Sequence, residues 1–328
     1  MKPVSRLLLL LGLLAAALLV GIRLGAVPLS VAQIIDAARG VGDPTTVAIV
    51  RRLRLPRSVL AALVGGSLAA SGATFQALLR NPLAEPYILG VSGGAAVGAV
   101  GAIVLAGALA SGPVVAACAF AGSVAAVLLV FRIAASVGRA LDTRILLLGG
   151  VVVGSFFNAC ILLALTFASS DAFRSAMFWM MGSFSGASWK GIGALAAVAL
   201  PSLAVLFALA RPLNLLAVGE ETAAYLGTRV ERTKLLAYGI ASLLTAASVA
   251  VSGTIGFVGL VIPHVVRMLW GGDNRFLLPA SVLLGASFMV LADALARTAA
   301  APTELPVGVV TAFVGVPFFV WLLRRRTA

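Results

Sequence analysis

The chain has 328 residues, of which 61% are hydrophobic and 11% are charged, and its formal net charge is +13. Soluble domains have about a quarter of their residues charged, so the composition excludes an ordinary soluble protein. The positive charge does not indicate a nucleic-acid partner, because no soluble basic domain carries it. In polytopic membrane proteins, Lys and Arg collect in loops and contact membrane lipid headgroups.

Long apolar runs fill most of the chain. A bilayer-spanning helix needs about 20 apolar residues, and backbone inside hydrocarbon must bond to itself, which leaves helices or closed barrels. Because the runs are continuous rather than alternating, we predict an all-helical polytopic membrane protein, a single transmembrane domain over 1–328, with about ten spans. The expected spans are residues 7–27, 58–79, 87–109, 113–136, 145–168, 191–210, 235–252, 256–269, 277–297 and 306–323.

The ends of the chain predict its orientation. An even number of spans puts both termini on one side of the membrane. Lys2 and Arg6 at one end and 324–326 (RRR) at the other predict that this side is the cytoplasm, since basic residues favour it. The segment "RRLRLPR", residues 51–57, then falls outside and is an exception to that rule.

The longest predicted cytoplasmic loop covers residues 211–234. Within it, "GEETAAYLG" predicts a short helix, because Glu220 and Glu221 suit the positive end of the helix dipole and Gly227 ends it. The segment is either a docking surface for a partner or a solvated loop with one helical turn.

Common motifs for nucleotide binding and metal binding are missing from the sequence. No G-x-x-x-x-G-K-[ST] or H-E-x-x-H motif occurs, and His264 is the only histidine, so we expect no catalytic residue, no metal site and no cofactor bound by this chain. Cys118 and Cys160 lie in apolar runs and predict no disulfide. Asp293 and Arg297, four residues apart, are expected to form an ion pair, and Glu304 is expected to cap the last span. This scarcity of charged residues in the spans fits a transport pathway whose energy is supplied from outside the chain.

Four sequence blocks resemble one family. They are "LRLPRSVLAALVGGSLAASGATFQALLRNPLAEPYILGVSGGA" (53–95), "GFVGLVIPHVVR" (256–267), "LADALAR" (291–297) and "ELPVGVVTAFVGVPFFVWLL" (304–323). In this order and spacing they resemble the FecCD-type permeases, the membrane subunits of ATP-binding-cassette (ABC) importers for iron-siderophores, haem and cobalamin. The likeness runs from about residue 51 to the C-terminus.

The resemblance implies a cobalamin-importer-type permease fold in the bacterial inner (plasma) membrane, with both termini cytoplasmic. It also implies four kinds of partner. These are a second copy of the chain, two cytoplasmic ABC ATPase subunits that bind ATP and Mg, a periplasmic or lipid-anchored substrate-binding protein, and membrane lipid. ATP hydrolysis would take place on the partner subunits, and no nucleic acid is implied.

The resemblance also assigns roles to particular residues. Asn81 and Leu83, in "NPLAEP", match one cytoplasmic gate of the family, and Asp142 and Thr143 fall at a second one. The loop helix matches the family's ATPase-coupling helices, through Gly219, Glu220, Glu221, Thr222, Ala223, Tyr225, Leu226 and Gly227. "FWMMGS" (178–183) also fits the family, without a chemical role that its residues reveal.

Docking of the binding protein is assigned to Arg54, Arg57 and Arg297. A planar guanidinium forms paired, charge-assisted hydrogen bonds to a carboxylate, which suits acidic residues on a binding protein. Arg51 and Arg52 are equally well explained by contact with lipid headgroups.

Two other classes of protein remain open. An ion-coupled secondary transporter would need a coupling site, for which Asp293 is the candidate. A polytopic membrane enzyme would need polar catalytic residues clustered at one depth, and none are visible. No residue separates haem, cobalamin and siderophores as substrates.

Overall fold

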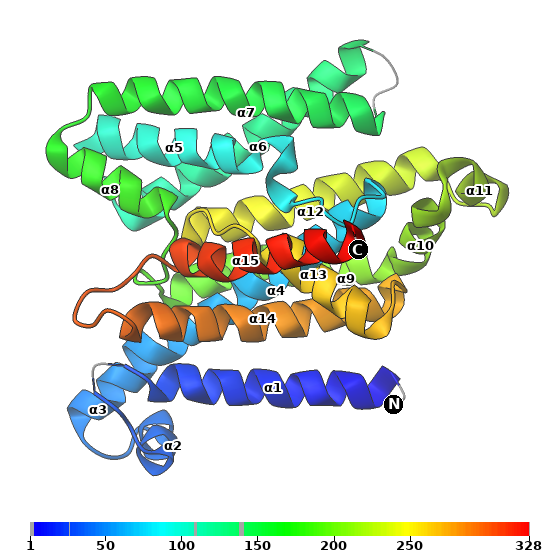
Figure 1. Cartoon of the computed structure of the whole chain (residues 1–328). Coiled ribbons are helices and arrows are strands. Elements are labelled where there is room, and N and C mark those ends of the chain that lie inside the picture. Colours follow the sequence, from blue (N-terminus) through cyan, green and yellow to red (C-terminus); the bar gives the residue numbers. More distant parts are fainter. Residues whose placement is uncertain (1–2, 26, 108–109, 138–140, 328) are drawn as a thin grey trace.

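The computed structural model describes residues 3–25, 27–107, 110–137 and 141–327, and all the regular structure in these ranges is helical (Figure 1). The helices are α1 (Pro3–Arg23), α2 (Val31–Arg39), α3 (Pro44–Ala48), the π-helix η1 (Ile49–Arg54), α4 (Leu55–Leu78), the 3₁₀ helix η2 (Pro86–Leu89), α5 (Val91–Ala106), α6 (Gly112–Val137), α7 (Thr143–Thr166), α8 (Ser170–Met180), α9 (Trp189–Ala208), α10 (Ala210–Val218), α11 (Glu220–Tyr225), α12 (Val230–Ser252), α13 (Val258–Trp270), α14 (Asn274–Thr298) and α15 (Val307–Thr327).

The long helices run back and forth between two ends of the bundle (Figure 1). Within the described residues, 7 helices are long and apolar enough to cross a membrane, and α5, α13 and α15 add shorter apolar stretches. This confirms the predicted all-helical membrane fold of about ten spans. We call the end with α10 and α11 the α11 end, and the end with α2 and α3 the α2 end. Helix α1 begins and α15 ends at the α11 end, as an even number of crossings requires.

Helix α4 is the centre of the bundle. In its apolar window 83% of the residues are buried, against 22% in α1, which lies at the edge of the bundle. It packs against α9, α12, α13 and α14. Its glycines make this possible, because a Cβ at Gly65 or Gly72 would overlap the backbone of Gly285 or Gly259. Close backbone contact of this kind stabilises helix pairs in membranes, where the hydrophobic effect does not drive association.

Two breaks interrupt the helical backbone inside the bundle. Residues 79–85 and η2 separate α4 from α5, and residues 253–257 separate α12 from α13. The second break is bounded by two left-handed residues, Gly253 (φ 70°) and Phe257 (φ 70°). A left-handed conformation is uncommon for a bulky residue such as Phe257, so the surrounding structure must hold it in place.

A proline inside α13 is compensated by a side chain of α4. Pro263 has no backbone N–H, so the carbonyl four residues earlier, that of Gly259, loses its helical partner. The Gln76 amide donates to the Gly259 and Leu260 oxygens at 3.3 and 3.2 Å, and Arg267 donates to the Gln76 oxygen at 2.9 Å. The carbonyl that Pro263 leaves without a helical partner is thereby paired within the protein.

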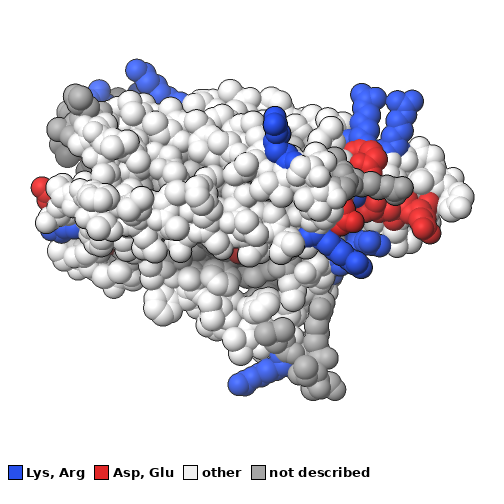
Figure 2. Space-filling view, turned by 90° about the horizontal axis from the view of Figure 1, so that it is seen from above, with Lys and Arg blue, Asp and Glu red and all other residues white. Residues whose placement is uncertain are grey.

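Charged side chains gather at the ends of the molecule. Figure 2 shows Lys and Arg beside Asp and Glu at the α11 end and a largely uncharged surface between the two ends. Large apolar side chains are exposed along the spans, including Leu148 (67%), Phe156 (61%) and Phe313 (77%). Exposed apolar surface on this scale fits a chain that lies in lipid or against another protein.

Candidate functional site

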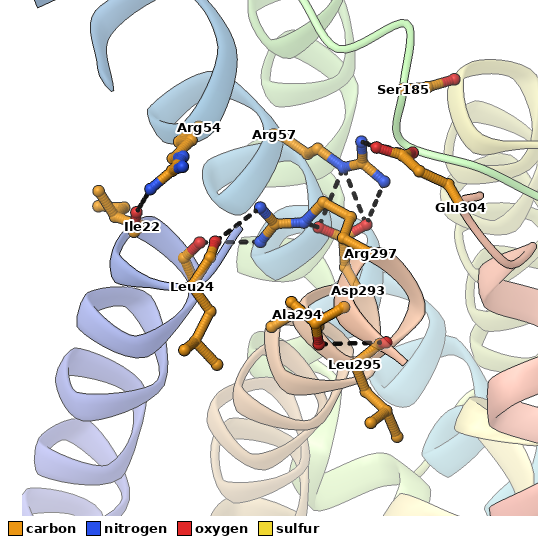
Figure 3. A network of polar contacts seen from close by, with 12 residues as sticks. Ile22, Leu24, Arg54, Arg57, Ser185, Asp293, Ala294, Leu295, Arg297 and Glu304 are labelled. Carbon is orange, nitrogen blue, oxygen red and sulfur yellow. Dashed lines mark hydrogen bonds and ion pairs between the residues drawn. The ribbon is translucent and has the colours of Figure 1, made fainter. Parts of the chain in front are cut away.

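Arg54, one of the arginines at the α2 end, contacts the end of α1. Arg54 is 7% exposed, and its guanidinium donates to the carbonyl oxygens of Ile22 (3.0 Å), Arg23 (3.2 Å) and Val27 (2.5 Å). Because the last carbonyls of a helix have no partner within it, Arg54 caps the end of α1. Figure 3 shows it pointing at that end.

Arg57, Asp293, Arg297 and Glu304 form one network beside Arg54 (Figure 3). Arg57 Nη2 lies 2.9 Å from Asp293 Oδ1, and Arg57 Nη1 lies 2.9 Å from Glu304 Oε2. On the other side of Asp293, Arg297 Nε lies 3.1 Å from Oδ2. Arg297 also donates to the carbonyl oxygen of Gly21 at 2.8 Å, so it too caps α1.

This network confirms the expected Asp293–Arg297 ion pair and adds contacts that spacing along the chain did not predict. Asp293 is 1% exposed and shares its charge between two arginines, whereas Glu304 is 47% exposed. Glu304, expected to cap the last span, instead pairs with Arg57. Docking by Arg54, Arg57 and Arg297 stays a prediction, and all three guanidinium groups already have partners within the chain.

The first predicted gate, Asn81 and Leu83, is a tight turn after α4. The Asn81 side-chain oxygen accepts the Leu83 N–H at 3.0 Å, a local bond that fixes the turn. Asn81 is exposed and Leu83 half-buried. The second predicted gate lies at the start of α7, where Asp142 is the N-cap and accepts the Arg144 N–H at 2.8 Å.

The turn that follows Leu83 holds the other break in the backbone. Glu85 Oε1 accepts the N–H of Phe257 at 2.9 Å. The Tyr87 hydroxyl donates to the carbonyl of Ile255 at 2.9 Å and accepts its N–H at 3.0 Å. Side chains at one interruption of the helical backbone therefore pair with the free backbone groups at the other, which is far away in the sequence.

An apolar cavity of about 550 Å³ borders the second break. Its walls come from the end of α8, from the break at 253–257 and from one face of α15, and almost all of its lining is apolar. The residues that line it are Met180, Met181, Thr254, Gly256, Phe257, Gly308, Val309, Ala312, Phe313, Val316 and Pro317. Volumes of this order accommodate organic ligands.

The motif "FWMMGS" (178–183) contributes to the wall of this cavity. Met180 and Met181 line it, and the Met181 carbonyl accepts the Gly308 N–H of α15 at 3.1 Å. Ser183 donates its N–H to the Ser252 carbonyl at 2.8 Å, which ties the motif to the end of α12. The sequence alone did not predict the residues that line this cavity, although Gly182, Gly253 and Gly256 indicated turns nearby.

The predicted loop helix exists and protrudes from the α11 end (Figure 1). It is preceded by α10, which was not expected. Ala223 is buried and anchors α11, whereas Tyr225 and Leu226 are 91% and 63% exposed. Gly227 ends the helix with a φ of 83°, as predicted. An exposed aromatic and an exposed aliphatic side chain on a protruding helix fit a protein contact.

A polar contact ties α10 to α14. The Arg275 N–H and the Asn214 amide donate to Asp273 at 3.0 and 2.6 Å and hold the pKa of its carboxyl below the usual value. Asn214 also accepts the N–H of Asn274 at 2.8 Å. The segment that carries α11 is therefore attached to the start of a long span.

His264, the single histidine of the sequence, lies in α13. His264 is buried, and its ring meets that of Phe318 edge-on, with centroids 6.5 Å apart. Among the described residues, no group of three or more His, Cys, Asp or Glu could hold a metal ion.

The fold and these segments define a polytopic helical membrane protein with an apolar cavity, and comparisons with known proteins identify its family. The model of the FecCD transport family matches residues 13–325. The chain therefore belongs to the FecCD transport family, as its motifs indicated. Members of this family are permease subunits of ABC transporters, which are not themselves ATPases; they work with ATPase subunits and dimerise.

Two curated relatives illustrate the match. The cobalamin import system permease protein BtuC of Halobacterium salinarum is 48% identical over 286 residues, covering 87% of this chain and 76% of the relative. The vitamin B12 import system permease protein BtuC of Escherichia coli is 43% identical, covering 84% and 83%.

Solved structures agree on the fold. A metal-chelate type ABC transporter in an inward-facing conformation matches with a TM-score of 0.88 and 32% identity, over 97% of this chain and 98% of that one. PsaBC from Streptococcus pneumoniae, in complex with a Fab, shares the fold at a TM-score of 0.58 and 18% identity, covering 89% and 94%.

The network at the α2 end predicts unequal effects for its two acidic residues. Replacing Asp293 by Asn leaves two buried arginines without their shared counter-charge and is expected to cost about 3–5 kcal/mol of stability. Glu304→Gln removes the half-exposed partner and is expected to cost less than about 1 kcal/mol. Thermal unfolding of the purified variants in detergent measures the difference, and equal losses would contradict the network.

Proposed function

We propose that the chain is the permease subunit of an ABC importer that moves a metal chelate across the plasma membrane. The observation that carries the proposal is the near full-length similarity to permeases whose names state cobalamin or vitamin B12 import. Those names favour cobalamin within the chelate class, which also includes iron-siderophores and haem. A substrate-binding protein delivers the chelate, and two ATPase subunits that bind ATP and Mg supply the energy. Both termini and the α11 end face the cytoplasm.

The apolar cavity is one half of the translocation path in this proposal. Its α15 wall carries Phe313 and Val316, which are 77% and 48% exposed and extend beyond the cavity. A second copy of the chain that packs against α15 would close the cavity into a path. Apolar walls suit passage of a bulky ligand, because weak contacts let it leave as well as enter.

The gates and the coupling helix act at the α11 end. Asn81 and Leu83 close the path at the turn after α4, and Asp142 and Thr143 close it at the start of α7. Tyr225 and Leu226 of α11 bind the ATPase subunit. The bonds of Glu85 and Tyr87 to the break at 253–257 support this arrangement, because they attach the first gate to the wall of the cavity.

Docking of the binding protein takes place at the α2 end, and the contacts of the three arginines support Arg57 as the residue that binds it. Arg54 and Arg297 cap α1, which makes them poor candidates for direct contact. Arg57 differs, because one of its two acidic partners, Glu304, is half exposed. An acidic residue of the binding protein reaches Arg57 by displacing Glu304, so Glu304 occupies the docking position until the partner arrives.

The same network argues against an ion-coupled secondary transporter. Asp293, the candidate coupling residue, is buried and pairs with both Arg57 and Arg297 through its carboxyl group. Release of that carboxylate for an ion would leave both arginines unpaired, at a high cost.

Reconstituted transport tests the function. The permease is assembled in proteoliposomes with its ATPase subunits and binding protein, and uptake of cyanocobalamin, a ferric siderophore and haem is measured with and without ATP. We expect ATP-dependent uptake of one member of this set, with cobalamin first, because the ATPase drives the gates. Equal uptake of each chelate without ATP would contradict the importer assignment.

Docking is tested without damaging the network. Glu304→Gln frees the Arg57 guanidinium and is expected to tighten binding of the binding protein by about two- to fivefold, the scale of an exposed ion pair. Asp36→Asn, on α2 at the same end, removes the same charge from an exposed residue and serves as the control. Affinity is measured on the permease in nanodiscs. An unchanged or weaker affinity for Glu304→Gln, or equal gains in both variants, would contradict docking at Arg57.

A further inference from the structure

Lys234 is a buried charge at the α11 end of the bundle. It lies near the start of α12 and is 3% exposed. A buried ammonium is stable only when it is paired and hydrogen-bonded. Its Nζ lies 3.0 Å from Glu220 Oε1 and donates a second hydrogen bond to the carbonyl oxygen of Leu141.

The two partners belong to segments that are far apart in sequence. Glu220 is the first residue of α11, and Leu141 directly precedes Asp142, the N-cap of α7. Apolar packing joins the same segments, because Leu141 and Ala223 lie in one buried cluster with Tyr238 of α12. One lysine side chain therefore lies between the helix assigned to the ATPase and the turn assigned to the second gate.

We propose that Lys234 is the positioning residue that transmits movement of α11 to the turn carrying Asp142 and Thr143. The inference rests on the proposed function, which assigns α11 to ATPase coupling and the turn to gating. If the ATPase displaces α11, the Lys234 ammonium cannot separate from Glu220 without becoming an unpaired charge in a buried position. It therefore follows the Glu220 carboxylate. Its bond to Leu141 then moves the start of α7.

A purely structural role for Lys234 predicts a different result. In that case its loss would lower stability and the yield of the complex, but the complexes that assemble would still pass movement from α11 to the gate. The response of the gate to nucleotide therefore separates the two roles, whereas stability alone does not.

The experiment follows the gate directly and needs no transport substrate. Thr143→Cys is placed in a chain whose Cys118 and Cys160 are replaced by serine, and the permease is assembled with its ATPase in nanodiscs. The rate at which a water-soluble maleimide modifies residue 143 is measured without nucleotide and with ATP trapped by vanadate. The ratio of the two rates reports the response of the gate.

We expect Lys234→Met to bring this ratio at least about twofold closer to one, while the complex still hydrolyses ATP. Lys234→Arg keeps the charge and is expected to retain the response. Arg232→Met removes an exposed charge from the same turn of α12 and should leave the ratio unchanged. If Lys234→Met does not assemble, Glu220→Gln, which breaks only the exposed side of the contact, is expected to shift the ratio in the same direction.

The outcomes separate the inference from the function on which it rests. If assembled Lys234→Met shows an unchanged ratio of modification rates at residue 143, the role of Lys234 is overturned and the proposed function is not. The same holds for Glu220→Gln where it replaces Lys234→Met in the experiment. A parent permease that binds no ATPase, or whose residue 143 never responds to nucleotide, would overturn the proposed function and this inference together.

Discussion

The Tyr87 hydroxyl, bonded to both the N–H and the carbonyl of Ile255, is the contact on which this arrangement depends. Backbone inside a membrane must satisfy its own polar groups, and a helix does so only while it is unbroken. This chain breaks two helices within the bundle and pairs one break with the other. Glu85 completes the pairing at Phe257, whose left-handed backbone needs such support.

This constraint explains why the cavity and the first gate are neighbours. The wall of the cavity is the break at 253–257, and the gate turn leads directly into Glu85 and Tyr87. Hydrogen bonds therefore connect this turn to one wall of the cavity. At the α11 end, Lys234 gives the second gate a corresponding attachment to α11. Both proposed gates are thus hydrogen-bonded to other segments, as the proposed alternating-access mechanism requires.

The sequence was sufficient to predict features that depend on local patterns. Continuous apolar runs predicted the spans, Glu220 and Gly227 predicted the bounds of α11, and the four-residue spacing predicted the Asp293–Arg297 pair. The contact between Arg57 and Glu304, 247 residues apart, has no local signal. Docking, gating and coupling came from the resemblance and stay proposals.

The arginine segment 51–57 illustrates why local patterns were insufficient. Its charge predicts a surface for an acidic partner, because membrane proteins seldom hold so many arginines outside. The end of α1 supplies another reason, since its unpaired carbonyls accept bonds from Arg54. A capping bond of this kind depends on where two helices meet, which spacing along the chain does not reveal.

We propose that the apolar cavity is part of an alternating transport path. Ala312, which lines it, can be replaced by cysteine in a chain whose Cys118 and Cys160 are serine. With the ATPase bound, impermeant thiol reagents are added from one side of the membrane at a time. We predict that trapping with ATP and vanadate moves the accessible side of residue 312 from one face to the other. Labelling that is the same from each side in both states would contradict the account.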